Sequence, residues 1–324
     1  MSKYRDLGNR LYSGESSLNI VGRRKLWYAV AAVVVILTVL LPTLRGGFNF
    51  GIEFRGGSEF RLTNSQELPQ SLAVDAIHSV VPDVQVVVAQ VGLADLRIQT
   101  EQLADVESEE ARLALAKAYG LSDEQVASSF IGPNWGEEVT NQALLGLLIF
   151  LVLVSILMAL YFRSWKMSAA ALIALAHDLI ITVGIYGAFG FEVTPAAVIG
   201  FLTVLSYSLY DTVVVFDKVR ENTQEIEFSE TRTFGEMVNL AVNQTLVRSI
   251  NTSIVGVLPV ASILFIGSIL LGAGTLRDIA LVMMVGTIVG TYSSVFLAAP
   301  VYSHLRENEP ALKAASDKVL AARS

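Results

Sequence analysis

Cysteine is absent from this 324-residue sequence, and charged residues make up only 16% of it. The chain therefore forms no disulfide, no Cys-ligated metal site and no thiol nucleophile. Its three histidines have no partner at metal-ligand spacing, and His78 and His304 are best explained as isolated side chains. No Walker-type phosphate loop, zinc-protease motif or basic patch interleaved with aromatic residues occurs. We therefore predict no catalytic residue, no metal site and no nucleic-acid partner, and we do not expect an enzyme.

Long apolar runs dominate what is present. Hydrophobic residues make up 53% of the chain and the mean hydropathy is +0.55, values above those of soluble domains. Six runs reach the length of about 20 residues that spans a bilayer. The sequence therefore predicts a membrane α-helical bundle of six transmembrane helices. The runs cover residues 26–44, 143–162, 168–191, 195–216, 249–271 and 277–302.

Lysine and arginine set the orientation of such a bundle, because in short loops they remain on the cytoplasmic side. Six of them precede the first run. Two more lie in the loop after the second run, four in the loop after the fourth run and four in the C-terminal tail. The opposite short loops contain only Arg277. We predict a multi-pass protein of the cytoplasmic membrane, in contact with membrane lipid, whose segments 1–25 and 303–324 are both cytoplasmic. The first run is interpreted as an uncleaved anchor.

The residues between the first two runs, 45–140, form one extracytoplasmic insert. The insert carries six basic and fifteen acidic residues, a net charge of −9, whereas the rest of the chain has a net charge of +2. This acidity either solvates the domain or helps to handle a basic or unfolded client. The residue pattern predicts a βαββαβ succession, which is the order of a ferredoxin-like domain. Its elements are a strand at 53–62, a helix at 65–80, strands at 84–91 and 95–100, a helix at 105–119 and a strand at 127–131.

Asp211 is the polar residue that most needs an explanation, because it lies inside the fourth run. A carboxylate at such a depth costs about 2.5–3.5 kcal/mol on insertion scales, so it is a functional candidate. Thr203, Tyr207 and Asp211 recur every four residues and share one helical stripe, which must face other helices or water. Asp211 is interpreted as a proton-relay group, with a structural ion pair or interhelical hydrogen bond as the alternative.

Two further polar groups lie in the predicted helices. Arg248 opens the fifth run and is followed by Asn251 and Thr252 on the same face. Arginine stays charged and can alternate between carboxylate-bound and free positions, so Arg248 is the predicted partner of Asp211; snorkelling to the interface is the alternative. His177 and Asp178 lie near the middle of the third run and serve either in the relay or as a tie between helices.

Two segments of the 141–302 region carry packing signals. Gly286 and Gly290 form a small-xxx-small face in the sixth run, where another helix can approach closely. Residues 234–247, within a cytoplasmic segment near 232–247, have the pattern of an amphipathic helix that lies on the membrane surface. We predict that this helix joins the two halves of the bundle.

These features resemble the SecF family, the smaller membrane subunits of the SecD–SecF accessory complex of bacterial protein export, related to the resistance-nodulation-division transporters. The matching stretches occur in family order over nearly the whole chain. They are FNFGIEFRGGSEF (48–60), FIGPNWGEE (130–138), AHDLIITVGIY (176–186), SYSLYDTVVVFDKVREN (206–222), RSINTS (248–253) and LRDIALVMMVGTIVGTYSS (276–294).

The resemblance implies a six-helix half-transporter that assists preprotein translocation together with SecD, the SecYEG channel and SecA. The proton gradient would supply the energy, and no cofactor is implied. In the family, the proposed proton-pathway residues match Asp211 and Arg248. Two positions depart from the family: Tyr210 stands where Asn or Asp is usual, a bulkier neighbour that could narrow water access, and Glu53 stands where Asp is common.

Two other functions remain alternatives. One is a half-transporter for small molecules in the same superfamily, and the other is a non-conducting membrane scaffold. The insert has under 100 residues, too few for the large porter domains that build a drug pocket. A single six-helix half also predicts that the chain needs a partner bundle, which the resemblance implies is SecD.

Overall fold

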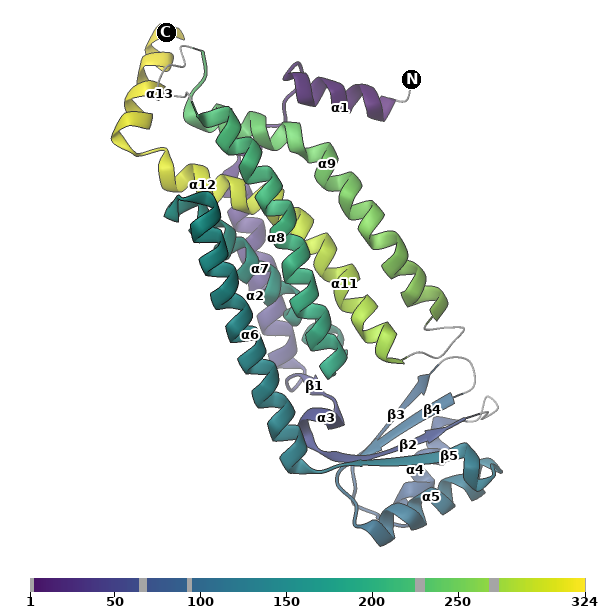
Figure 1. Cartoon of the computed structure of the whole chain (residues 1–324). Helices are drawn as coiled ribbons and strands as arrows, with labels where there is room; N and C mark the ends of the chain where they lie inside the picture. Colours follow the sequence, from purple (N-terminus) through teal and green to yellow (C-terminus); the bar gives the residue numbers. More distant parts are fainter. Residues whose placement is uncertain (1–2, 64–68, 92–94, 225–230, 268–273, 324) are drawn as a thin grey trace.

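The computed structural model describes residues 3–63, 69–91, 95–224, 231–267 and 274–323. Six spans in these residues are long and apolar enough to cross a membrane, which confirms the predicted bundle. The helices run alongside one another, with an α/β domain at one end and both termini at the other (Figure 1). The spans are formed by α2 (Arg24–Leu44), α6 (Pro133–Phe162), α7 (Trp165–Phe189), α8 (Pro195–Thr223), α9 (Phe234–Ser262) with the π-helical turn η3 (Ile263–Gly267), and α11 (Gly274–Ser293) continued by the π-helical turn η4 (Ser294–Ala298) and α12 (Ala299–Arg306).

Helices α7, α8 and α11 form the centre of the bundle. Small residues allow α8 and α11 to approach closely. A Cβ added to Gly286 would lie 3.0 Å from Cβ of Val204, and one added to Gly290 would lie 2.8 Å from Cβ of Ser208. Helices α2, α6 and α9 are much less buried and present large apolar side chains outward. The two glycines therefore lie where the central pair of helices is closest.

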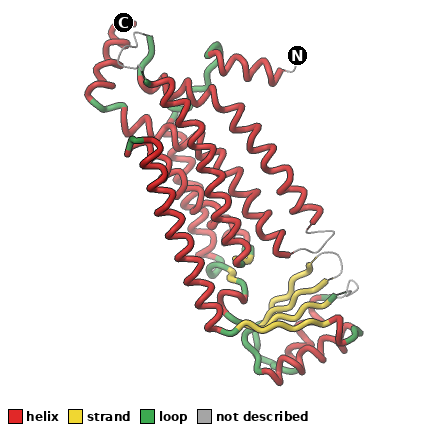
Figure 2. Tube along the Cα trace, in the orientation of Figure 1, coloured by secondary structure: helices red, strands yellow, loops and turns green. Residues whose placement is uncertain are grey.

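The α/β domain consists of four antiparallel strands and two helices. Its strands lie in the order β3-β4-β2-β5, and α4 and α5 cover one face of the sheet (Figures 1 and 2). Phe60, Ile98 and Leu115 are fully buried between the sheet and the helices. The elements are β2 (Gly57–Leu62), α4 (Gln70–His78), β3 (Val86–Val91), β4 (Asp95–Thr100), α5 (Asp105–Tyr119), a 3-10 turn (Asp123–Gln125) and β5 (Val126–Ile131).

The start of this domain differs from the prediction. Ile52–Arg55 forms a helical turn, α3, so the predicted strand at 53–62 was wrong over its first residues. Gly56 and Gly57 have φ values of +77° and +148°, which β-carbon-bearing residues rarely adopt, and they separate the turn from β2. Residues 65–68 of the predicted helix at 65–80 lie outside the described residues.

A short parallel strand pair joins the domain to the bundle. β1 (Asn49–Phe50) pairs with β6 (Glu192–Val193), which lies in the turn between α7 and α8. The N–H of Gly51 adds a 2.9 Å hydrogen bond to the carbonyl of Val193. The chain that leaves α2 is therefore fixed to the bundle before it enters the domain.

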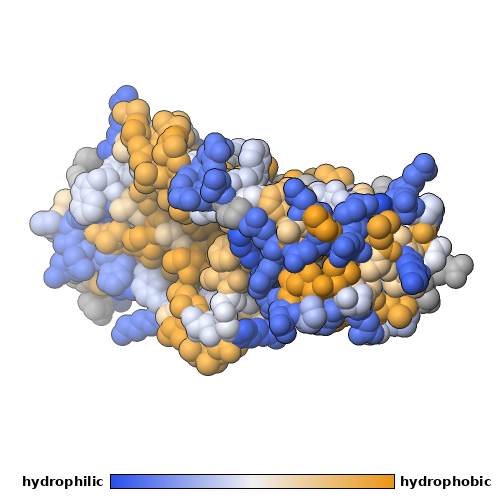
Figure 3. Space-filling view, turned by 90° about the horizontal axis from the view of Figure 1, so that it is seen from below, coloured by the Kyte–Doolittle hydropathy of each residue, from blue (hydrophilic) through white to orange (hydrophobic). Residues whose placement is uncertain are grey.

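In the view from the domain's end, hydrophilic residues gather over much of the domain, while hydrophobic residues cover much of the neighbouring bundle (Figure 3).

Helix α9 is continuous, in contrast to the predicted surface helix at 234–247 followed by a separate span from 249. The Thr233 side chain and Glu236 cap its start, and no proline occurs in it before Pro259. Phe234 and Val238 are buried in the main apolar core. The apolar face of the amphipathic segment is thus covered by the protein itself, so the segment extends the fifth span. Residues 268–271 of the predicted fifth run lie outside the described residues.

Both terminal segments pack against the end of the bundle opposite the α/β domain. Asn239 accepts hydrogen bonds from the N–H groups of Ile20 and Val21 at 2.9 and 3.0 Å, and Asn243 bonds the backbone of Leu18 in both directions. These asparagines fix the segment that follows α1 (Lys3–Ser13). On the other side, α13 (Pro310–Arg323) is held by an ion pair between Arg323 and Glu236, 2.7 Å long.

Candidate functional site

Asp178 of α7 is the most enclosed carboxylate in the bundle, with 0% of its side chain exposed. Its Oδ2 accepts a hydrogen bond from Ser208 of α8 and a 2.7 Å hydrogen bond from Ser293 at the end of α11. One carboxylate therefore joins the three central helices. This arrangement satisfies the requirement that a charged or polar group in a membrane faces protein partners.

His177 lies on the other side of the same carboxylate. Its Nδ1 is 3.2 Å from Oδ1 of Asp178, and its ring centroid is 6.1 Å from that of Tyr292. Its Nε2 is buried and has no hydrogen-bond partner among the described residues. The contact between His177 and Asp178 lies within α7 and leaves one imidazole nitrogen without a partner among the described residues.

Asp211 of α8 is also buried, with 6% exposure. Its Oδ1 accepts a 2.8 Å hydrogen bond from Ser249 of α9. Its Oδ2 is enclosed and accepts no hydrogen bond from the described residues. Asp211 thus contacts α9 through one carboxylate oxygen, and the other oxygen has no donor among the described residues.

Hydroxyl groups lie between the two carboxylates. The Thr212 hydroxyl is 2.9 Å from that of Ser294, and Ser294 donates to the carbonyl of Gly290 at 2.8 Å. Ser208, which donates to Asp178, lies one turn before Thr212 on the same helix. Ser294 begins the π-helical turn η4, an irregularity that often occurs at functional positions. The site is therefore a polar layer across α7, α8, α9 and α11.

Arg248 is near this layer but does not bind Asp211 directly. Its side chain is exposed, and among the described residues it makes no ion pair within 4.0 Å. The neighbouring Ser249 makes the contact instead. The predicted direct Asp211–Arg248 pair is therefore not formed in this conformation, and the free guanidinium lies one residue away from the group that holds Asp211.

The other predicted polar residues lie on α8 and α9. Thr203 is exposed and donates to its own helix at the carbonyl of Ile199, 2.8 Å away. The hydroxyl of Tyr207 faces α9, where a Cβ on Gly256 would lie 3.1 Å from it. Asn251 is exposed and Thr252 is half-buried on α9.

Tyr210 lies on the outward surface of α8, although it precedes Asp211 directly. Its side chain is 56% exposed, whereas Asp211 is buried, because successive helical residues point about 100° apart. The bulky ring therefore lies outside the chain's own polar layer.

A second polar cluster connects the α/β domain to the bundle. Arg97 of β4 forms an ion pair with Glu192 of β6, and Gln99 donates to Glu192 at 3.0 Å and to Glu59 at 3.1 Å. Nearby, Thr194 donates to Asp278 at the start of α11, 2.9 Å away. The outer end of α11 and the turn before α8 thus meet the sheet in one charged junction.

Glu53 completes this junction from α3. A Cβ on Gly51 would contact Oε2 of Glu53 and lie 3.2 Å from Oε1 of Glu192, so the two carboxylates are close. Burial raises the pKa of the Glu53 carboxyl, and the charges of Glu192 and Glu59 raise it further, against the opposing effect of Arg97. Its Oε2 has no hydrogen-bond partner among the described residues. The junction therefore contains a carboxyl that binds a proton more readily than an exposed one.

Sequence reasoning missed several residues of these clusters. Ser249, Ser293 and Ser294 are ordinary polar residues in apolar runs. Ser293 and Ser294 follow Gly290 by three and four residues, which places them on the same helical face as that glycine. Ser249 has no such signal. Arg97 and Glu192 carry no linear signal, because 95 residues separate them. Long-range contacts of this kind are decided by how the domain is seated on the bundle.

The fold and the site together define a class: a polytopic helical membrane protein with ionisable groups buried between its spans and one α/β domain inserted after the first span. In helical membrane proteins, buried carboxylates of this kind mark ion or substrate pathways.

Residues 112–308 match the family described as "Protein export membrane protein SecD/SecF, C-terminal", and the chain belongs to this family. Over its full length it is 44% identical to the protein translocase subunit SecF of Streptomyces coelicolor, covering 86% of that protein. It is 40% identical over 98% of its length to SecF of Mycobacterium leprae, covering 70% of that protein. The family expected from the sequence is thereby confirmed.

The chain also resembles part of a longer protein whose name, SecDF, combines SecD and SecF. It is 32% identical to the protein translocase subunit SecDF of Thermus thermophilus, over 88% of this chain and 39% of that protein. The crystal structure of SecDF, a translocon-associated membrane protein from that organism, superposes with a TM-score of 0.76 at 27% identity, over 90% of this chain and 39% of that one. The chain thus corresponds to about two-fifths of the longer protein.

Proposed function

We propose that the chain is the SecF-type subunit of a bacterial protein-export complex and that it uses the proton gradient, with a SecD-type partner, to assist the passage of preproteins through the SecYEG channel beside SecA. The single observation that carries the proton coupling is the buried Asp211, whose Oδ1 is held by Ser249 and whose Oδ2 has no donor among the described residues. A buried carboxylate oxygen without a donor is available to take up a proton. No cofactor is required by this proposal.

In the proposed cycle, Asp211 loads a proton and Arg248 stabilises the state in which the proton has left. Arg248 is exposed and unpaired in this conformation among the described residues, so it is free to approach Asp211 when Ser249 turns away. Asp178 and the hydroxyls of Ser208 and Ser293 hold α7, α8 and α11 together while this change occurs. His177, whose Nε2 has no hydrogen-bond partner among the described residues, is a further member of the relay in this proposal.

The proposed movement reaches the α/β domain through α11. This helix carries Ser293 at the polar layer, and Asp278 near its other end contacts Thr194 within the charged junction. We assign the domain to the ferredoxin-like class and to the extracytoplasmic side; the βαββαβ order and the strand order β3-β4-β2-β5 support the class. Its acidic surface would then face the emerging polypeptide.

The partner and the location follow from the same proposal. The relatives include a SecDF chain of which this protein matches only 39%, which supports a SecD-type bundle as the missing part. Both termini lie at the end of the bundle opposite the α/β domain (Figure 1), and the excess of lysine and arginine at that end supports a cytoplasmic position for both in the bacterial cytoplasmic membrane.

The test is Asp211→Asn, measured in inverted membrane vesicles that contain the partner subunit and the translocation channel. The variant keeps the size of the side chain and the Ser249 contact but cannot release a proton. We expect normal membrane insertion, normal copurification of the partner and loss of the part of preprotein translocation that depends on the proton gradient.

The matched control is Asp217→Asn on the same helix. Asp217 is exposed and accepts a 2.8 Å hydrogen bond from Tyr161, so the same change of charge should leave translocation unaltered. Normal proton-dependent translocation in Asp211→Asn would leave the polar layer as a set of helix ties and would refute the coupling. Absence of a copurifying SecD-type partner with the unmodified chain would refute the half-transporter assignment.

A further inference from the structure

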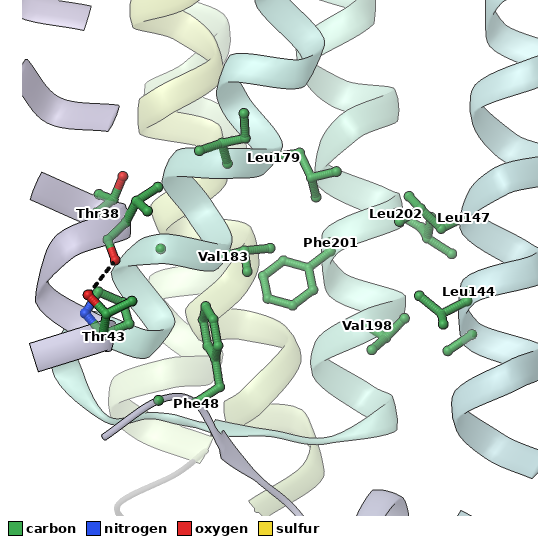
Figure 4. A pocket seen from close by; sticks show the side chains of 16 residues that line it. Thr38, Thr43, Phe48, Leu144, Leu147, Leu179, Val183, Val198, Phe201 and Leu202 are labelled. Carbon is green, nitrogen blue, oxygen red and sulfur yellow. Dashed lines mark hydrogen bonds between the residues drawn. The ribbon is translucent and has the colours of Figure 1, made fainter. Parts of the chain in front are cut away.

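A groove of about 530 Å³ lies in the half of the bundle nearest the α/β domain. Figure 4 shows Thr38 and Thr43 of α2 on one side, Leu144 and Leu147 of α6 on the other, and α7 and α8 between them. The volume is in the range of ligand pockets and far above the packing defects of a helix bundle. The groove therefore has room for a guest.

The walls of the groove accept only an apolar guest. Its two hydroxyl side chains are already used by α2 itself: Thr38 donates to the carbonyl of Val35 at 3.0 Å, and Thr43 donates to that of Leu40 at 2.7 Å. The other lining residues are aliphatic or aromatic, or are glycine, and Phe201 lies at the centre (Figure 4). A peptide backbone, sugar or anion would find no free hydrogen-bond donor on these side chains.

Close packing elsewhere holds the groove open. A Cβ on Gly184 would lie 2.6 Å from the carbonyl oxygen of Thr38, and one on Gly187 would lie 2.6 Å from the ring of Phe48. Helix α2 is therefore packed closely on α7. Phe48 closes the end of the groove nearest the α/β domain (Figure 4). The space between α2 and α6 follows from these contacts.

The position of the groove indicates what fills it. Thr38–Thr43 lie about 2–9 Å from the end of α2, at 1.5 Å per residue, which is within the roughly 15 Å of hydrocarbon in one leaflet. Large side chains at the mouth, Val39 and Leu144, are 54% and 61% exposed. The hydrocarbon interior of a bilayer excludes water at this depth, so the walls gain dispersion contacts from an apolar group such as a hydrocarbon chain.

Arg45 lies next to the end of this groove in the chain. Arg45 follows the lining residue Thr43 and precedes Gly47, and its guanidinium is near the end of α7, where a Cβ on Gly190 would lie 3.8 Å from Nη1. Among the described residues Arg45 has no carboxylate partner, although nine ion pairs of other lysines and arginines occur there. An arginine at headgroup depth is suited to bind a phosphate with paired N–H groups.

We infer that this groove binds one acyl chain of an anionic phospholipid from the leaflet on the side of the α/β domain, with the phosphate of the headgroup at Arg45. The chain lies between α2 and α6 and contacts Phe201, and its end is covered by Phe48. The site is separate from the carboxylate layer and does not depend on proton coupling. It makes a lipid a structural component of the subunit.

The experiment reconstitutes the full chain, with its partner bundle, into vesicles that contain phosphatidylglycerol with a photoreactive group in one acyl chain. Labelled residues are then mapped by peptide mass spectrometry. The blocking variant is Ala143→Trp, which adds bulk from the α6 wall. Its matched control is Ala159→Trp, on an exposed position of the same helix outside the groove. Thr43→Trp fills the groove from the opposite wall and serves where Ala143→Trp does not insert.

We expect label on Leu144, Leu147 and Phe201 in the unmodified chain and in Ala159→Trp, and loss of that label in Ala143→Trp or Thr43→Trp. Label that persists in the blocking variants, or label found only on α6 outside the groove, overturns the inference.

A second arm compares phosphatidylglycerol with phosphatidylcholine carrying the same chain. Arg45→Gln should abolish the preference for the anionic lipid and Arg45→Lys should retain it; equal labelling by both lipids in the unmodified chain refutes the role of Arg45.

Discussion

Substitution of Gly286 by alanine tests the central contact of the bundle with a single methyl group. The new Cβ would lie 2.8 Å from Cγ2 and 3.0 Å from Cβ of Val204 on α8. A valine in a helix has one strongly preferred rotamer, and its Cβ does not move on rotation, so a side-chain adjustment cannot relieve the clash. Helices α8 and α11 must move apart instead.

The size of the effect follows from these distances. Carbon atoms pack at about 3.5–4.0 Å, so the helices must separate by roughly 0.7 Å. The hydrogen bond from Ser293 to Asp178 is 2.7 Å long, and the same displacement takes it beyond the ordinary range for O–H···O bonds. Overpacking alone costs about 1–3 kcal/mol, and weakening a hydrogen bond to a carboxylate adds to this loss.

The measurement is the apparent unfolding temperature in detergent, together with proton-dependent translocation in vesicles. We expect a fall of about 2–4 °C for each kcal/mol and reduced translocation. Gly146→Ala on α6 is the control, because a Cβ there meets no atom within 4 Å. If Gly286→Ala is as stable and as active as Gly146→Ala, α8 and α11 are not packed as closely as described, and the reasoning fails.

Three further predictions concern the polar contacts. Ser249→Ala removes the 2.8 Å hydrogen bond to Asp211, worth about 0.5–3 kcal/mol across the protonated and charged forms of the acceptor, and should impair proton-dependent translocation. Ser262→Ala, whose hydroxyl is exposed and bonds its own helix, should not, and equal activity of the two variants would contradict the assignment. The pKa of Glu53 is raised in the folded state, so its contribution to stability is present below the unfolded pKa of about 4.3 and is lost as the pH rises through the folded pKa. Glu53→Gln should therefore raise the unfolding temperature at neutral pH and flatten the pH dependence of that temperature. An unchanged pH profile would refute this. Asn239→Ala should speed amide exchange at residues 18–21, because three hydrogen bonds to this segment are lost; unchanged exchange would show that the segment is held by other contacts.

The sequence was sufficient where the membrane itself imposes the rule. A span must be about 20 residues long and apolar, so six runs predicted six helices, and the cost of a buried carboxylate singled out Asp211 without any structural information. Periodicity also predicted the succession of strands and helices in the insert, with β4 at 95–100 and α5 at 105–119 as the structure has them. Local glycine conformations, as at Gly56 and Gly57, were harder to predict because they depend on backbone angles rather than on polarity.

Tertiary structure alone decided which polar groups meet. Asp211 pairs with Ser249 and leaves Arg248 free, a choice that depends on the rotation of α9 about its axis and not on residue type. The continuous α9, the Arg97–Glu192 ion pair and the groove between α2 and α6 all arise from how elements are seated on one another. The hydrophobicity of a segment depends on that segment alone, so it can be predicted from the sequence. Hydrogen bonds and close contacts act over a few ångströms between segments that are far apart in sequence. They therefore form only once the helices are packed.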